Sequence, residues 1–283
     1  MVMDIDGTLV TGQKYIPKRM AGVIRHLRDK GILVTIATGR VLASTRHLAR
    51  KLAIDLPVIC NDGVQIHDWQ EGRDIYFDPI SPPIAAKAFS IIRKYPVRMQ
   101  LFLQDKKLYY GIKYRPRMLK HYLRVTGLNP RSLWNHLRDF YFIPHQVMPA
   151  TASSLGEYLQ EQGPAKITFN ARDNDREEII VRLEEEIAGG LSFTSGVAGW
   201  LDILKEGNSK WSAIKQLAEM YNIREEEIIT AGDNYNDLEM LKYAGLGIAM
   251  ETAPAAVKEI ADVVVPAPEE DGLAEYLESL LLI

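Results

Sequence analysis

Short apolar runs alternate with amphipathic stretches at both ends of this chain, and this alternation restricts the possible folds more than any other feature. Residues 32–37 form an almost continuous apolar, β-branched run, typical of a strand buried on both faces. Pro17 stands where a helix is expected to begin, and Gly31 where it is expected to stop. A helix is predicted at 42–52, and further strands are predicted at 1–5 and 57–60. Strands and helices in this order predict a parallel sheet with right-handed crossovers.

The C-terminal part repeats this style. The predicted elements there are helices at 210–221, 238–243 and 254–260, a final helix, and strands at 228–231, 246–250 and 263–265. We expect the two ends of the chain, 1–80 and 205–283, to share one sheet. The predicted fold class is therefore α/β, with a Rossmann-like, doubly wound parallel sheet at its core.

The middle of the chain, 81–204, has a different pattern. Its predicted elements are helices at 84–95, 117–125, 154–162 and 176–187, and strands at 97–103, 107–112, 140–142, 166–170, 191–194 and 200–204. The first two strands flank Asp105 and Lys106 as a predicted hairpin. Strands paired in hairpins and backed by helices indicate an α+β layer, so we interpret this segment as a domain inserted into the first.

The composition is that of a globular protein with a substantial core, since 47% of the 283 residues are hydrophobic and 25% are charged. The single cysteine, Cys60, excludes an internal disulfide framework and fits a reducing compartment. No apolar run approaches the roughly 18 residues that span a bilayer, so no membrane partner is expected. Because the N-terminus also lacks a signal-peptide pattern, the expected location is cytoplasmic.

Two carboxylates follow the first predicted strand at a spacing of two residues. Asp4 is placed to attack phosphorus and Asp6 to transfer protons, while Gly7 permits a tight turn. A calcium loop shares part of this pattern, but the twelfth position counted from Asp4 is Tyr15 and not the glutamate of an EF-hand. A plain surface turn is the other interpretation of this segment taken alone.

Three further segments put polar groups where strands are predicted to end, which is the edge at which open α/β sheets bind ligands. Thr38 and Gly39 offer a hydroxyl and N–H groups that suit a phosphate oxygen, although such a pair is also an ordinary helix entry. Lys210 begins a predicted helix, where a lysine is normally solvated. Residues 232–237 combine carboxylates and amides that suit a hard cation, with helix capping as the alternative.

These four segments, in this order and at these spacings, resemble the haloacid dehalogenase superfamily over essentially the whole chain. More narrowly, the sequence resembles the Cof-type phosphatases, in which a large cap domain is inserted between the second and third motifs. The segment 81–204 corresponds to that cap, which supplies much of the substrate specificity. The resemblance implies Mg²⁺ as the cofactor, a small phosphorylated metabolite as the substrate and an aspartyl-phosphate intermediate.

The resemblance also implies roles at matching positions. Asp4 is the expected nucleophile and Asp6 the expected acid and base, while Thr38 and Lys210 are expected to hold the phosphoryl oxygens. The candidate metal ligands are Asp4, Asp6 through its backbone carbonyl, Asp233, Asn234 and Asp237. The candidate substrate-binding residues are Thr8, Gly39, Arg40, Asn61, Asp62, Gly63 and Asn236.

Two departures from the family pattern bear on the substrate. Trp211 follows Lys210 where the family usually has glycine, and the family's Asn-Gly-Ala reads Asn-Asp-Gly-Val at 61–64. Asp62 therefore brings a carboxylate near the phosphate site, unless Asn61 turns in instead.

The charge is unevenly distributed, because 81–204 holds 17 Lys and Arg against 12 Asp and Glu, whereas the rest of the chain holds 17 against 25. No acidic residue lies between Lys106 and Arg138. If this basic run lines a cleft, it favours substrates with more than one negative group. A solvated charged surface is the alternative interpretation.

Two other functions stay open at this point. A phosphotransferase or phosphomutase uses the same aspartyl-phosphate chemistry, and product analysis separates it from a hydrolase. A phosphate-binding or nucleic-acid-binding protein without catalysis is suggested by the basic run and its aromatic residues, but the net charge of -3 disfavours nucleic acid as a partner. The sequence leaves the oligomeric state open.

Overall fold

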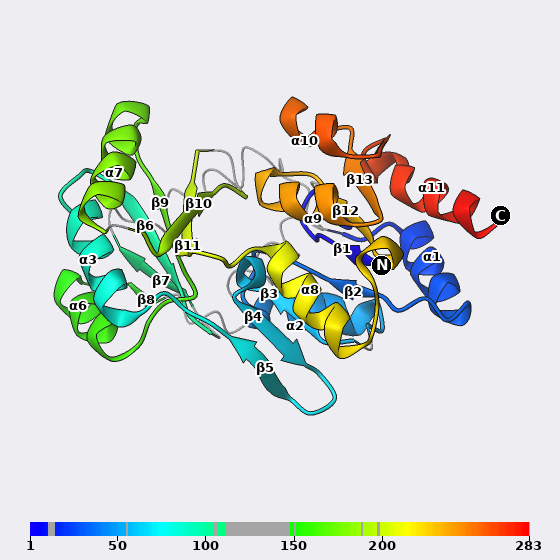
Figure 1. Cartoon of the computed structure of the whole chain (residues 1–283), viewed down its shortest axis with the longest axis horizontal. Coiled ribbons are helices and arrows are strands. Elements are labelled where there is room, and N and C mark those ends of the chain that lie inside the picture. The colour runs from blue at the N-terminus through cyan, green and yellow to red at the C-terminus, as the bar shows by residue number, and fades with distance from the viewer. Residues whose placement is uncertain are drawn as a thin grey trace, which may run out of the picture. The chain divides into compact units, whose positions relative to one another are not determined.

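The chain separates into two units in the computed structural model, which describes residues 1–10, 15–54, 56–104, 107–110, 148–149, 151–187, 189–196 and 199–282 (Figure 1). The first unit comprises Met1–Arg40, Thr45–Tyr76 and Ser209–Ile283, and the second comprises Val41–Ser44 and Phe77–Asn208. Each unit has its own sheet and its own packed core.

The first unit is built on a parallel sheet that both ends of the chain share. Its strands, in spatial order, are β14 (Val263–Val265), β13 (Leu246–Met250), β12 (Ile229–Gly232), β1 (Val2–Met3) and β2 (Thr35–Ile36). Met3 is central, because it pairs in parallel with Ala231 on one side and with Ile36 on the other. The predicted α/β class and the shared sheet are confirmed.

The helices around this sheet begin and end near the predicted residues. They are α1 (Lys18–Asp29), α2 (Leu42–Lys51), α8 (Lys210–Met220), α9 (Leu238–Tyr243), α10 (Ala255–Ile260) and α11 (Gly272–Leu281). Short 3₁₀ turns lie at η3 (Glu225–Glu227) and η5 (Pro268–Glu270). Gly31 follows the end of α1, and its φ of 81° is a conformation that favours glycine. Helices α1 and α11 pack together, as do α8 and α9 (Figure 1).

A small sheet of β3 (Val58–Cys60), β4 (Gln65–Asp68) and β5 (Arg73–Phe77) extends the first unit. Strand β3 joins the main sheet through a parallel bridge between Ala37 and Ile59, and pairs antiparallel with β4. The sequence analysis did not predict β4 and β5. Their turn is made by Asp68, whose Oδ1 accepts hydrogen bonds from the N–H groups of Gln70 and Glu71.

The second unit is a sheet with helices on one face, as the α+β pattern predicted. Its strands, in spatial order, are β10 (Leu191–Thr194), β11 (Leu201–Lys205), β9 (Lys166–Asn170), β6 (Arg98–Phe102), β7 (Lys107–Tyr110) and β8 (Met148–Pro149). Its helices are α3 (Pro82–Ile92), α6 (Ala152–Glu161) and α7 (Asp173–Glu186). Their apolar faces pack on alternate side chains of the sheet, such as Leu101, Phe169 and Ile203.

Several predictions fall partly or wholly outside the described residues. Strands β6 and β7 pair antiparallel as predicted, but Asp105 and Lys106 between them are not described. The predicted helix at 117–125, the predicted strand at 140–142 and most of the basic run also lie outside the described part of the chain. Among the helices that are described, none is long and apolar enough to cross a lipid bilayer.

Candidate functional site

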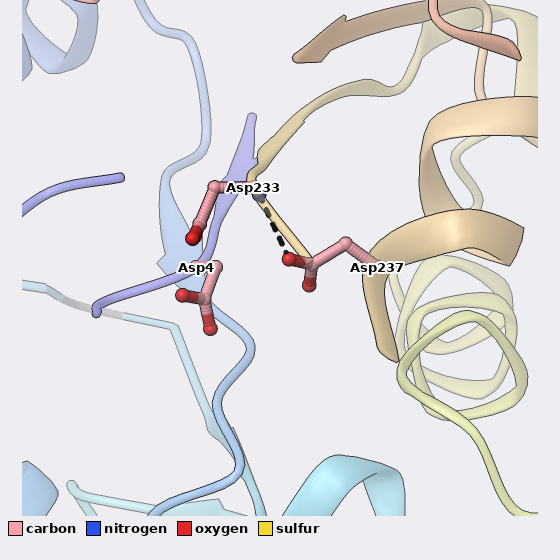
Figure 2. A group of neighbouring side chains, drawn as sticks. All are labelled: Asp4, Asp233 and Asp237. Atoms are coloured by element: carbon pink, nitrogen blue, oxygen red, sulfur yellow. Dashed lines mark hydrogen bonds between the residues drawn. The ribbon is translucent and has the colours of Figure 1, made fainter. Parts of the chain in front are cut away.

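Three carboxylates from distant parts of the sequence meet at one edge of the first unit's sheet (Figure 2). Asp4 directly follows β1, Asp233 directly follows β12, and Asp237 ends the 3₁₀ turn η4 (Tyr235–Asp237). One carboxylate oxygen of each lies within 4.8 Å of the others. Because β1 and β12 are parallel neighbours, their carboxyl ends bring Asp4 and Asp233 together.

Lys210 lies among these carboxylates and is almost completely buried, with 1% of its surface exposed. Its Nζ donates to Asp4 Oδ1 and to Asp237 Oδ1, both at 2.6 Å. The side chain is positioned by the first turn of α8, where Ser209 and Ser212 form a reciprocal capping box. Lys210 is therefore not the solvated lysine that is usual at the start of a helix.

The Asp237 carboxylate also holds the loop that follows β12. Its Oδ2 accepts hydrogen bonds from the N–H groups of Asp233 and Asn234, at 2.9 and 3.0 Å. Asn234 Oδ1 in turn accepts from the N–H of Tyr235 and caps the turn. Capping and the carboxylate cluster thus coexist in this segment, with Asp237 oriented by the backbone on one side and by Lys210 on the other.

Burial and mutual repulsion dominate the electrostatics of this cluster. Burial raises the pKa of Asp4 well above its ordinary value; Lys210 opposes this, and the carboxylates of Asp237 and Asp233 add to it. Burial, followed by the Asp237 carboxylate, raises the pKa of Asp233 to about 7. Burial alone lowers the pKa of Lys210, but the carboxylates of Asp237 and Asp4 outweigh it and hold that pKa above its ordinary value.

The donor set of this cluster fits a divalent cation that prefers oxygen. Lys210 supplies one positive charge against three carboxylates, so the ionised cluster keeps a net negative charge. Burial and, after it, the Asp237 carboxylate raise the pKa of Asp233, and a hard dication with oxygen ligands relieves the excess negative charge. The residues present therefore fit Mg²⁺.

Asp6 and Thr8 lie in the turn after Asp4. Arg40 donates from Nε and from an Nη to the two oxygens of Asp6, both at 2.6 Å, so Arg40, predicted to bind substrate, is paired with Asp6. Thr8 Oγ1 donates to Asp233 Oδ1 at 3.0 Å. Gly7, at φ 90°, is required between them, because a Cβ there comes within 2.3 Å of Asp233 Oδ2.

The predicted phosphate-binding residues Thr38 and Gly39 sit beside the turn η1 (Asn61–Gly63). The N–H of Asp62 donates to the Thr38 carbonyl at 3.0 Å, and the N–H of Asn61 donates to the Arg40 carbonyl at 2.9 Å. Thr38 Oγ1 accepts from the Arg40 N–H at 3.2 Å. Backbone hydrogen bonds therefore join the segment 38–40 to the turn η1.

The turn η1 has an unusual backbone. Asn61 and Asp62 have φ of 52° and 56°, a left-handed conformation that costs a non-glycine residue about 1–3 kcal/mol. Gly63, at φ 98°, lies so close to Ser209 that a Cβ there would come within 1.9 Å of its carbonyl oxygen. The surrounding contacts must therefore hold the turn in place.

The structure answers the question that the departure at 61–64 raised. Asp62 is buried and its Oδ1 accepts from Asn236 Nδ2 at 2.7 Å, and its charge also acts on Lys210. Asn61 instead donates from Nδ2 to Gln65 Oε1 at 3.1 Å. Asp62 thus brings its carboxylate toward the cluster, and Asn236 is bound to it.

A chain of hydrogen-bonded polar side chains next to this turn was not predicted; it is formed by Gln65, His67 and the partly exposed Asp74. Gln65 and His67 are buried on β4 and Asp74 lies on β5. The signal was available, since polar residues alternate with Ile66 in a strand pattern. Without the predicted β4–β5 pair, however, nothing indicated that they face a common partner.

Comparisons with known proteins identify the family of the chain. A family model described as haloacid dehalogenase-like hydrolase matches residues 1–277. The 5-amino-6-(5-phospho-D-ribitylamino)uracil phosphatase YitU of Bacillus subtilis is 26% identical over 285 residues, which cover 98% of this chain and 96% of YitU. The pyridoxal phosphate phosphatase YbhA of Escherichia coli is 25% identical over 287 residues, which cover 100% of this chain and 98% of YbhA.

The fold comparison points the same way. The solved structure of a haloacid dehalogenase-like hydrolase from B. subtilis matches with a TM-score of 0.81 and 25% identity, covering 99% of each chain. The motifs, the fold and the match over nearly the whole length agree. The chain therefore belongs to the haloacid dehalogenase-like hydrolase family and is a Cof-type phosphoric monoester hydrolase.

Proposed function

We propose that this enzyme is a Mg²⁺-dependent phosphatase that hydrolyses a small organic phosphate through an aspartyl-phosphate on Asp4. The observation that carries the proposal is the shared Nζ of Lys210, which lies 2.6 Å from both Asp4 and Asp237 in a cluster with excess negative charge. Such a cluster is costly for a fold to keep, and buried groups with strongly shifted pKa values are characteristic of catalytic sites.

In the proposed reaction, a carboxylate oxygen of Asp4 attacks phosphorus while the bond from phosphorus to the ester oxygen breaks. Asp6, protonated and released from its ion pair with Arg40, gives its proton to that leaving oxygen. Its carboxylate then takes a proton from the water that hydrolyses the aspartyl-phosphate. Inorganic phosphate leaves and Asp4 is restored. Thr38 and Lys210 hold the phosphoryl oxygens, which suits a reaction that depends mainly on positioning and electrostatics.

The proposed metal ligands are Asp4, the backbone carbonyl of Asp6 and Asp233. Asn234 and Asp237 support them, since Asp237 already contacts Lys210 and two backbone N–H groups. When bound, Mg²⁺ supplies positive charge that offsets the repulsion between a carboxylate nucleophile and a phosphate dianion.

The proposed substrate is a sugar phosphate or a similar metabolite. YitU and YbhA are named for a ribityl phosphate and for pyridoxal phosphate, two small esters with a polar leaving group. Segment 81–204 is the proposed specificity domain, and Thr8, Gly39, Arg40, Asn61, Asp62, Gly63 and Asn236 remain the proposed substrate-binding set. A cytoplasmic location also stays a prediction.

A phosphate-release screen tests the proposal. Sugar phosphates, nucleotides and cofactor phosphates, including pyridoxal phosphate, are incubated with the enzyme in Mg²⁺ and again after chelation with EDTA. We expect release with Mg²⁺ for at least one small ester, loss of release after chelation, and recovery when Mg²⁺ is restored. Full activity in EDTA contradicts the metal assignment. Transfer of the phosphoryl group to a second sugar in place of water indicates a transferase or mutase.

A further inference from the structure

A line of buried side chains leads away from the proposed site along the small sheet of β3, β4 and β5. Gln65 and His67 point to one face of β4, since they are two residues apart, and both meet Asp74 on the neighbouring strand. Gln65 Nε2 donates to Asp74 Oδ2 at 3.0 Å. His67 Nδ1 lies 2.7 Å from Asp74 Oδ1, where a ring N–H donates to the carboxylate. Asp74 therefore holds both residues through its two oxygens.

The inner end of this line is Asn61, the first residue of the left-handed turn. Its Nδ2 donates to Gln65 Oε1 at 3.1 Å, while its buried Oδ1 finds no hydrogen-bond donor among the described residues. The hydrogen bond to Gln65 is thus the side-chain contact that orients Asn61 among the described residues. Because Gln65 donates its own amide hydrogen to Asp74, its carbonyl oxygen is left facing Asn61.

The orientation of Asn61 matters for the proposed chemistry because the turn touches the site at several points. The N–H groups of Asn61 and Asp62 bind the carbonyls of Arg40 and Thr38. The Asp62 carboxylate accepts from Asn236 at 2.7 Å and acts on the charge of Lys210. We expect a turn held in a costly conformation to relax when one of its supports is removed. Because Asp62 lies in the turn and Thr38 is hydrogen-bonded to it, both residues then shift together.

We propose that Gln65, Asp74 and His67 are positioning residues, which hold the Asn61–Gly63 turn so that Thr38 and Asp62 are in register with Asp4 and Lys210. These three residues act through the turn and do not touch the reacting atoms. This inference rests on the proposed phosphatase function, and it adds residues that lie in none of the four motifs.

The variants either break or preserve the hydrogen bonds that Gln65 and Asp74 make. Gln65→Met keeps the length of the side chain but removes both hydrogen bonds, and Asp74→Leu removes both acceptors. Asp74→Asn is the conservative variant, since its carbonyl still accepts from Gln65 and its amide donates to the other tautomer of His67. Thr35→Val is the matched control, because it deletes a buried hydrogen bond to the Pro57 carbonyl in the same unit without touching the line.

The experiment measures kcat and KM of the full chain with p-nitrophenyl phosphate. It also measures amide hydrogen exchange of the folded protein at residues 58–66. For Gln65→Met and Asp74→Leu we expect kcat to fall about tenfold with KM within about twofold, together with faster exchange at the turn. Asp74→Asn and Thr35→Val should stay within about threefold of wild-type kcat, with slow exchange at the turn.

Several outcomes overturn the inference: unchanged kcat in Gln65→Met, equal losses in Asp74→Asn and Asp74→Leu, or a loss in Thr35→Val that matches Gln65→Met. If Gln65→Met does not fold, Gln65→Asn replaces it, because one methylene less leaves an amide that cannot reach both neighbours. If the wild type hydrolyses no phosphate ester, the proposed function fails, and turn exchange alone then decides the positioning inference.

Discussion

Each unit of this molecule buries a lysine, and the two lysines have opposite surroundings. Lys210 in the first unit and Lys166 in the second are 1% and 3% exposed. Lys210 contacts two carboxylates at 2.6 Å, and a third lies in the same cluster. Among the described residues, Lys166 forms an ion pair with Asp202 at 3.3 Å.

The comparison separates a structural ion pair from a reactive one. Asp202 also accepts from the Thr168 hydroxyl, and Lys166 Nζ lies 4.5 Å from the centre of the Phe102 ring, so this ion pair is supported by a hydrogen bond and by packing. Around Lys210 the charges do not balance, and burial together with the neighbouring carboxylates raises the pKa values of Asp4 and Asp233. A fold keeps such an imbalance where a ligand completes it, so the unbalanced cluster is the one that indicates function.

The largest expected effect comes from Asp4→Asn, which preserves shape but removes the nucleophile. We expect kcat to fall by about 10⁴-fold or more, by analogy with the loss of other catalytic nucleophiles. Asp202→Asn makes the same change beside the other buried lysine and should leave kcat within a few-fold of wild type. Phosphate release and circular dichroism measure both variants. Retention of a tenth of the activity by Asp4→Asn contradicts its role as nucleophile.

The lysines themselves give the second test. With Mg²⁺ saturating, Lys210→Met should lower kcat/KM by roughly 10²–10³-fold, because a charge aimed at the transferring phosphoryl group is lost. Lys166→Met should leave kcat near the wild-type value but cost about 3–5 kcal/mol of stability, since it leaves Asp202 buried without its cation. Steady-state kinetics and urea unfolding separate the two. A kinetic defect of equal size in both variants removes the distinction between the units.

A smaller effect distinguishes acid catalysis within the first unit. Asp6→Asn should slow hydrolysis of an alkyl phosphate about tenfold to a hundredfold more than that of p-nitrophenyl phosphate, because a good leaving group needs little protonation. Arg40→Met serves as a second variant, since it removes the bidentate partner of Asp6 and leaves the carboxylate in place. Equal losses on both substrates in Asp6→Asn argue against an acid role.

The smallest expected effect is on stability. Since the folded pKa of Asp233 is raised from 3.8 to about 7, the folded protein binds more protons than the unfolded chain between those values. Stability of the metal-free protein should therefore fall as pH rises from about 4 to 7. Melting temperatures in EDTA should show Asp233→Asn reducing this decline by roughly 5 °C. Asp202→Asn should leave the pH dependence of the melting temperature unchanged. An unchanged pH dependence in Asp233→Asn contradicts a raised pKa for Asp233 in the folded protein.

Much of the fold was predictable because its signals are local. The strands at 246–250 and 263–265 match the predicted ranges, since continuous apolar runs bounded by turns have few alternatives. Strand β1 is shorter than its predicted range of 1–5, although the N–H of Asp4 still donates to the Ala231 carbonyl on β12 at 2.9 Å. The β4–β5 pair was missed because its buried face is polar, and burial of polar residues depends on partners that periodicity does not show.

By itself, the sequence determined most of the elements, the α/β class and the identity of the acidic residues at the strand ends. Hydrophobic periodicity and turn chemistry are local properties, so they can be read from neighbouring residues. Only the tertiary structure decided which charges meet: Lys210 with Asp4 across 206 positions, Arg40 with Asp6, and Asn236 with Asp62. Those pairings depend on the register and order of the parallel strands, and they set burial and repulsion, which no single segment of the chain encodes.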